Sequence, residues 1–176
     1  MMDIYVILAI IILLIFIPHL VIRKRKNKHY QKKITADMVI RKISEIEHPG
    51  RKIAYLRKID PYAFEELILT LLQRRGFVIA RNTKYSGDGG IDGRFKHEGK
   101  VWFVQAKRYS HRIKIEHVKN FHTLLKDNNC NGIFVHTGTT PLSVRRYEGT
   151  LSNNRLEIIS GNRLLALFDS KVKEKF

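Results

Sequence analysis

Two short motifs of this chain carry side chains that could bind a metal ion and act on a phosphate group. The first, SGDGGID, ends in the carboxylate of Asp92, and the second, QAK, runs from Gln105 to Lys107. The apolar residues around them favour two antiparallel strands joined by a turn at residues 97–99, and such strands lie about 4.8 Å apart. Because side chains alternate along a strand, Gln105 and Lys107 share one face. The spacing therefore predicts that Asp92 faces both of them.

A carboxylate, an amide oxygen and a backbone carbonyl are hard oxygen ligands of the kind that Mg²⁺ takes. We expect Asp92, Gln105 and the carbonyl of Ala106 to bind Mg²⁺, with Mn²⁺ as a second candidate, and Asp88 either to lie near the metal or to shape the loop. The ammonium group of Lys107 could orient an attacking water or stabilise charge on a scissile phosphate. This pattern indicates a metal-dependent phosphodiesterase. The spacing is also compatible with a simpler structure, in which the glycines form a turn, Asp92 is a turn residue and Lys107 ends a strand in solvent.

These motifs resemble the Mrr-type restriction endonuclease domain, a branch of the PD-(D/E)xK nuclease superfamily. The resemblance is carried by FEEL at residues 64–67, SGDGGIDG at residues 86–93 and QAKRY at residues 105–109, and it spans residues 61–168. It implies a restriction-endonuclease-like, three-layer α/β/α core with a mixed sheet. It also implies an endonuclease that cleaves DNA and restricts incoming or modified DNA.

Residue by residue, the resemblance places the metal-binding aspartate of the family at Asp92, its Q-x-K pair at Gln105 and Lys107, and its helical glutamate, a further metal ligand, at Glu65. Most members of the superfamily have Glu or Asp in place of Gln105, and one negative charge fewer should weaken metal binding. Without the resemblance, the position of Glu65 is more typical of a solvated first-turn glutamate that the helix dipole favours. Its neighbour Glu66 lies at another angle on the helix, so we expect it at the surface.

The charge of the chain favours a polyanionic partner. There are 33 Lys and Arg residues against 16 Asp and Glu, a formal net charge of +17, and the charge is still +13 without residues 1–28. Such an excess favours nucleic acid or an acidic membrane surface. We expect contacts with DNA phosphates where basic residues follow the second motif, at Arg108, Tyr109, His111, Arg112, Lys114 and Lys119. Contacts of this kind position a duplex without selecting its sequence.

Several other side chains are expected to be ordinary structural or surface residues. Trp102 lies in the second strand and is expected in the core. The histidines near the basic segment, His111, His117 and His122, are expected to be exposed. Cys130 is the one cysteine, so the chain forms no internal disulfide and no cysteine-based zinc site.

The amino-terminal stretch at residues 4–22 is apolar apart from Pro18 and His19, and is long enough to cross a bilayer as a helix. The basic cluster RKRKNK at residues 23–28 follows it, and the positive-inside rule places such a cluster in the cytoplasm. We therefore expect a single-pass anchor over residues 1–22 in the inner, cytoplasmic membrane, with the carboxy-terminal domain in the cytoplasm. A cleaved secretory signal would carry its positive charges before the apolar run.

We expect a basic linker and helical spacer at residues 23–59, followed by the Mrr-like domain at residues 60–176. The spacer pattern predicts a helix over residues 36–47, ended by Pro49 and Gly50, and one or two helical turns over residues 51–59. For the domain, the pattern predicts a helix from Pro61 that is capped at Gly76, strands at 77–81, 91–96 and 101–107, a helix at 115–126, a strand at 133–135, a helix at 141–148, a strand at 156–159 and a helix at 162–168. This order is typical of a mixed α/β sheet flanked by helices.

Two classes of function are compatible with these features. The first is a membrane-anchored, Mg²⁺-dependent DNA endonuclease, and a homodimer would be favoured if both strands are cut. The second is a catalytically weak module that tethers DNA at the membrane, which Gln105 in place of a carboxylate would favour. An RNA nuclease is a third alternative, because charge does not separate DNA from RNA.

Overall fold

The computed structural model describes residues 10–14, 31, 33–82, 90–151 and 155–169. The expected membrane span at residues 4–22 falls mostly outside these ranges, as does Asp88 in the glycine-rich motif. Within the described ranges, no helix combines the length and the apolar character that a membrane crossing requires.

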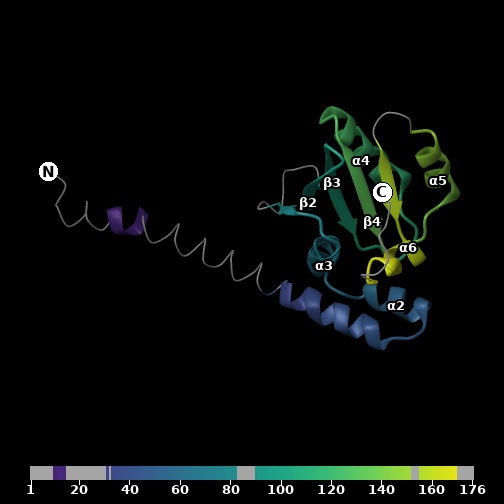
Figure 1. Cartoon of the computed structure of the whole chain (residues 1–176), viewed down its shortest axis with the longest axis horizontal. Helices are drawn as coiled ribbons and strands as arrows, with labels where there is room; N and C mark the ends of the chain where they lie inside the picture. The colour runs from purple at the N-terminus through teal and green to yellow at the C-terminus, as the bar shows by residue number, and fades with distance from the viewer. Residues whose placement is uncertain (1–9, 15–30, 32, 83–89, 152–154, 170–176) are drawn as a thin grey trace.

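A five-stranded mixed sheet forms the centre of the molecule (Figure 1). Its strands, in spatial order, are β1 (Ala80–Arg81), β2 (Gly93–His97), β3 (Lys100–Lys107), β4 (Asn131–His136) and β5 (Leu156–Ile159). Strands β1, β2 and β3 pair antiparallel, whereas β3, β4 and β5 pair parallel. The turn between β2 and β3 falls where the sequence predicts it, because Glu98 and Gly99 have φ angles of 50° and 75° and two-residue hairpin turns favour positive φ. The expected α/β class is confirmed.

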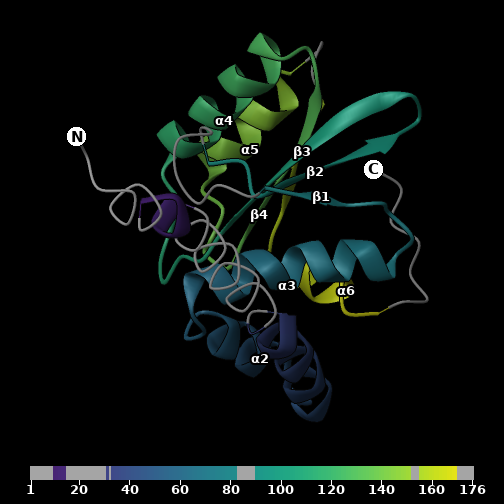
Figure 2. The same cartoon turned by 90° about the vertical axis from the view of Figure 1, so that its left-hand side faces the viewer.

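Helices cover both faces of the sheet, which gives three layers (Figure 2). Helices α4 (Ile115–Asp127) and α5 (Leu142–Gly149) lie on one face, while α3 (Pro61–Arg74) and α6 (Gly161–Ala166) lie on the other. Alternating side chains of β3 divide the core: Trp102 and Val104 pack into the cluster of α3, and Phe103 packs into the cluster of α4. The expected core position of Trp102 is confirmed.

The residues that bound α3 explain why this helix begins and ends where it does. Asp60 is the N-cap, and its Oδ1 accepts a hydrogen bond from Ala63 N at 3.0 Å. Pro61 takes the first helical position, where its missing N–H costs nothing. Gly76 follows the C-cap with φ +95°, a conformation that favours glycine. Both ends agree with the sequence prediction.

The helical spacer packs onto the domain core. Residues 33–45 are helical, and a second helix, α2 (Pro49–Leu56), follows them. Ala36, Val39 and Leu56 are buried in the same cluster as the apolar side of α3. Pro49 starts α2 as its first residue.

The predicted strand at residues 77–81 is much shorter in the structure. Only Ala80 and Arg81 pair, with Arg94 and Gly93 of β2. The antiparallel register would place residues 77–79 opposite residues 95–97 of β2, but these residues do not pair. Phe77 packs against the core without belonging to the sheet.

Glu66 is not at the surface, so that prediction is wrong. The residue is 6% exposed, and its Oε1 accepts a hydrogen bond from Arg81 Nε at 2.7 Å. Thr70 lies one turn further along α3 and donates to the same oxygen at 3.4 Å. This ion pair joins α3 to β1. The surface prediction rested only on the angle of Glu66 around the helix, which does not indicate a partner in a strand.

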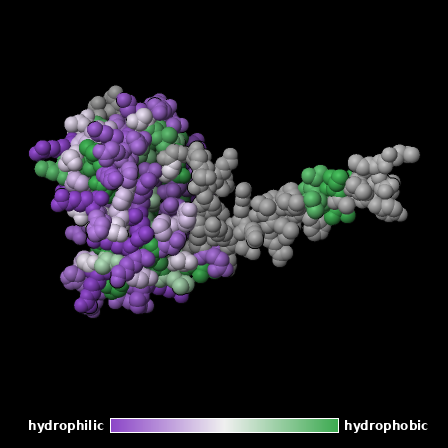
Figure 3. All heavy atoms as spheres, turned by 180° about the vertical axis from the view of Figure 1, so that it is seen from behind, coloured by the Kyte–Doolittle hydropathy of each residue, from purple (hydrophilic) through white to green (hydrophobic). Residues whose placement is uncertain are grey.

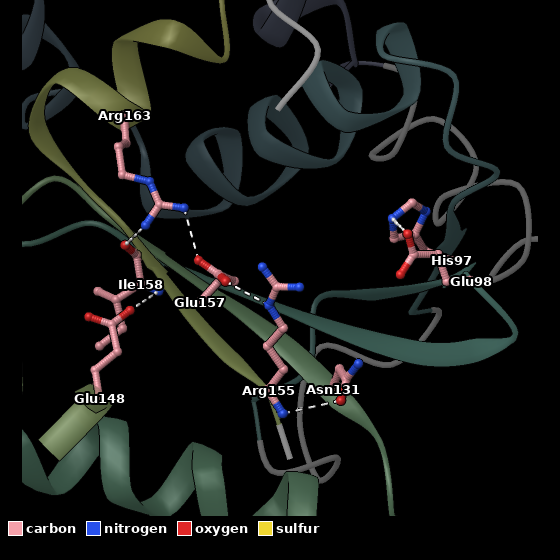
Figure 4. A network of polar contacts seen from close by, with 8 residues as sticks. All are labelled: His97, Glu98, Asn131, Glu148, Arg155, Glu157, Ile158 and Arg163. Atoms are coloured by element: carbon pink, nitrogen blue, oxygen red, sulfur yellow. Dashed lines mark hydrogen bonds and ion pairs between the residues drawn. The ribbon is translucent and has the colours of Figure 1, made fainter. Parts of the chain in front are cut away.

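Side chains protect the outer edge of β5 (Figure 4). Gly132 N donates to Arg155 O, so the backbone polar groups of Arg155 face β4. These groups alternate between the two edges along a strand, so the N–H of Ile158 points away from β4. Glu148 of α5 accepts this N–H at 3.0 Å. An edge donor that is already bound is a poor template for pairing with another chain.

Candidate active site

Asp92 lies immediately before β2, with its carboxylate against the backbone of β3. Its N–H donates to Val104 O at 2.9 Å, and its Oδ2 accepts from Ala106 N at 2.6 Å. Because Gly93 pairs with Val104, the next residues along the two strands, Asp92 and Gln105, are brought opposite each other. The structure therefore brings Asp92 beside the QAK motif.

The electrostatics of Asp92 connect it to two other predicted site residues. Burial raises its pKa from 3.8 to about 8, and the nearby carboxylate of Glu65 adds to the increase. The hydrogen bond from Ala106 N and the charge of Lys107 act in the opposite direction. Groups from α3, the start of β2 and the end of β3 thus lie within electrostatic reach of one another.

Gln105 holds the end of the glycine-rich segment in place. Its side chain is buried, with 4% exposure, and its Nε2 donates to Gly90 O at 2.7 Å. Gly90 has φ +84°, and a Cβ there would collide with Gln105 Nε2. Because Nε2 is directed at Gly90, the amide oxygen is the atom of this side chain that could act as a metal ligand.

The backbone of Ala106 completes the set of oxygen donors. The N–H and C=O of one strand residue point to the same side of the strand, and Ala106 N faces Asp92. The carbonyl of Ala106 therefore faces this side too.

This donor set fits a divalent metal ion. The described part of the chain holds no group of three or more His, Cys, Asp and Glu side chains suited to a metal. The predicted site instead combines the carboxylates of Asp92 and Glu65 with an amide and a backbone oxygen, all of them hard donors. The charge of Glu65 raises the pKa of Asp92, because the two carboxylates repel each other when both are ionised. A bound cation would offset this repulsion.

Lys107 is the last residue of β3 and lies near two histidines. Its Cα partner in β4 is His136, whose burial lowers its pKa to about 4, so this imidazole is neutral at pH 7. Burial, followed by the charges of Lys107 and Lys114, lowers the pKa of His117 as well. The histidines around Lys107 are therefore expected to be neutral, whereas Lys107 and Lys114 carry positive charge near His117.

The predicted DNA contacts fall into two groups. Arg108 and Tyr109 are half-buried and already hydrogen-bonded: Arg108 Nη1 donates to Arg57 O at 2.6 Å, and Tyr109 pairs with Thr137 and His117. Burial raises the pKa of Tyr109 to about 12. His111, Arg112, Lys114 and Lys119 are exposed. The DNA-binding role of both groups stays a prediction.

Two of the three histidines expected at the surface are partly buried instead. His117 is hydrogen-bonded through Nδ1 to the hydroxyl of Tyr109, and His122 Nδ1 lies 2.7 Å from the hydroxyl of Tyr147. His111 is exposed, as expected. The partner tyrosines lie 8 and 25 residues away along the chain, beyond the spacing of a helix turn, so the local pattern carried no signal for either contact.

Comparison with protein families agrees with this geometry. A family model for the Mrr catalytic domain, described as restriction endonuclease, matches residues 56–168. The match spans the whole sheet and every candidate site residue. The chain belongs to this restriction endonuclease family, and it carries an Mrr-like, restriction-type endonuclease domain whose substrate class is DNA. Domains of this type generally use divalent metal ions. No curated protein gives a significant match.

Proposed function

We propose that the chain hydrolyses DNA phosphodiester bonds by metal-assisted attack of water, with Asp92, Gln105, Lys107 and Glu65 as its active site. The main support is the convergence on Asp92: burial and Glu65 raise its pKa, whereas Lys107 lowers it. A buried carboxylate within electrostatic reach of a second carboxylate and an ammonium group suits a cation and a phosphate together.

Each residue has a separate part in this proposal. Asp92, Glu65, the amide oxygen of Gln105 and the carbonyl of Ala106 would hold Mg²⁺ or Mn²⁺. When bound, such an ion lowers the pKa of water and neutralises charge on the phosphate. Lys107 Nζ would donate hydrogen bonds to the attacking water or to a phosphate oxygen, which fixes their relative orientation.

The basic surface beyond β3 would bind the duplex. Arg112, Lys114 and Lys119 are exposed in the segment that follows the QAK motif. The charges of Lys107 and Lys114 both act on His117, so a phosphate backbone held at Lys114 would pass close to Lys107. Arg108 and Tyr109 would support this surface from their half-buried positions.

The direct test is plasmid cleavage by the purified full chain in Mg²⁺, Mn²⁺ or EDTA. We expect nicking or cutting only with a metal ion, and loss of cleavage with retained DNA binding in Asp92→Ala and Lys107→Ala. Lys100→Ala is the matched control, because Lys100 is exposed at the opposite end of β3 and should leave the rate unchanged. Metal-independent cleavage, or full activity in Asp92→Ala, would overturn the proposal.

The second candidate function is a catalytically weak module that tethers DNA. Gln105 favours it, because an amide replaces the carboxylate of most PD-(D/E)xK enzymes and provides no charge for the metal. The same assay separates the two functions: wild type that binds plain and methylated plasmid but cuts neither would favour the tether. Cleavage that depends on methylation would support restriction of modified DNA.

We also propose that residues 4–22 anchor the protein in the cytoplasmic membrane with the endonuclease domain in the cytoplasm. Residues 10–14, which lie within the stretch, form an exposed helical turn of apolar side chains, coloured as hydrophobic in Figure 3. The test is recovery of the full chain in membranes after an alkaline wash, beside a variant with three Lys residues placed within the stretch. Release of both forms into the supernatant would contradict the anchor.

A further inference from the structure

Side chains from three distant parts of the chain form a closed set of hydrogen bonds next to Lys107. Arg57, the C-cap of α2, donates from Nε to Thr137 O at 2.9 Å. The backbone carbonyl of Arg57 in turn accepts a hydrogen bond from Arg108 Nη1 at 2.6 Å. The end of α2 is therefore bound both to the segment after β3 and to the segment after β4.

The hydroxyl of Thr137 closes the set. Thr137 Oγ1 accepts from Tyr109 N at 2.9 Å and donates to Tyr109 O at 2.8 Å. The hydroxyl of Thr137 thus binds both the N–H and the C=O of Tyr109. Thr137 itself is only 1% exposed. We call Arg57, Arg108, Tyr109 and Thr137 the Arg57 clamp.

The surroundings of the clamp leave the backbone little room to move. Gly138 follows Thr137, and a Cβ at this glycine would collide with His111 O and lie 2.9 Å from Tyr109 Cβ. Thr139 N donates to His111 O at 3.1 Å, and Ile113 N donates to Thr139 O at 3.2 Å. The loops after β3 and β4 are consequently held together along their length.

We propose that Arg57 and Thr137 are positioning residues of the active site. The clamp starts at the residue directly after Lys107, so it fixes the backbone from which the lysine side chain reaches Asp92. A displacement of about 1 Å at a reacting group can cost about a hundredfold in rate. The inference rests on the proposed endonuclease function and makes α2, most of which precedes residues 56–168, part of the catalytic unit.

The chemistry of the clamp explains why these residue types are used. A buried threonine hydroxyl left without partners would cost free energy, and the main-chain groups of Tyr109 satisfy it. Arg108 directs its Nη1 inward to Arg57 O, so one donor of this guanidinium serves the clamp instead of DNA.

The test compares Arg57→Ala, Arg57→Lys and Thr137→Val in the full chain, with Arg51→Ala as the matched control because Arg51 is exposed on α2. We expect kcat for plasmid nicking to fall by roughly tenfold or more in Arg57→Ala and Thr137→Val, with KM for DNA changed less than about twofold. Arg57→Lys should recover much of the rate, because its ammonium can still donate to Thr137 O. The double variant should lose less than the product of the two single losses, because both changes break one set of contacts.

Amide hydrogen exchange at Tyr109 provides a readout that does not need activity. Its N–H should be protected in wild type and should exchange faster in both Arg57→Ala and Thr137→Val. Unchanged kcat in these variants, or a change confined to KM, would overturn the positioning role. If wild type does not cleave DNA, the proposed function fails, and unchanged exchange at Tyr109 in the variants would overturn the clamp separately.

Discussion

Replacing Asp92 with Asn should stabilise the metal-free protein while it removes the carboxylate on which cleavage depends. Burial, and then Glu65, raise the pKa of Asp92 from 3.8 to about 8. At a pH between these two pKa values, Asp92 is protonated in the folded protein and ionised in the unfolded chain. The contribution of this group to stability is therefore complete below about pH 4 and is lost as the pH rises towards 8.

The size of the effect follows from the shift. Each pKa unit corresponds to ~1.4 kcal/mol, so a shift of roughly four units sets a ceiling of ~6 kcal/mol at pH 8. Relaxation and water around the charged form reduce this ceiling, and we expect ~2–4 kcal/mol. An Asn oxygen can still accept from Ala106 N, as Asp92 Oδ2 does, so the substitution removes the charge and keeps this contact.

The assay is urea unfolding of both proteins in EDTA at pH 4, 6 and 8. The free energy of unfolding should be higher for Asp92→Asn at pH 8, and the difference should close towards pH 4. Glu65→Gln, which removes the smaller of the two causes, should recover only part of that difference. A variant that is less stable than wild type at pH 8, or a difference that does not change with pH, would contradict the raised pKa of Asp92.

Three further outcomes follow from individual contacts. Glu66→Ala should lower the free energy of unfolding by ~2–3 kcal/mol in urea, because it leaves a partly buried Arg81 without its carboxylate; a loss below ~0.5 kcal/mol would contradict this. Gln105→Glu should bind Mg²⁺ about tenfold more tightly in calorimetry, because it adds a charged ligand, and an unchanged Kd would argue against Gln105 as a ligand. Cys130 is buried, and burial raises its pKa to about 11. A thiol reagent at pH 8 should therefore label Cys130 only as fast as the protein unfolds. Immediate labelling of the folded protein would count against its burial.

Strong local signals explain which parts of the fold could be predicted. The limits of α3 follow from Asp60, Pro61 and Gly76, each of which acts on backbone within three residues of itself. Strand β5 was predicted with its observed limits at residues 156–159. The strand at residues 77–81 was predicted too long, because an apolar pattern does not show which of its residues pair with β2.

The candidate site shows the same division. The spacing of the two motifs predicted that Asp92 and Lys107 meet, and the structure brings them within electrostatic reach. Their chemical roles stay predictions. The contact between Arg57 and Thr137 spans 80 residues, and the sequence has no local signal for it. Long-range polar contacts depend on the packing of the whole domain, so short motifs indicate candidate site residues but not their distant hydrogen-bond partners.

In the function that we propose, water attacks a DNA phosphorus atom with the assistance of a metal ion, Asp92 and Lys107. The most direct measurement is mass spectrometry of DNA ends produced by the full chain with Mg²⁺ in water enriched in ¹⁸O. The account predicts Mg²⁺-dependent ends whose new phosphate carries one ¹⁸O atom, and no such ends with Asp92→Asn. Absence of cleavage by wild type, or cleaved ends whose phosphate has no label, would contradict it.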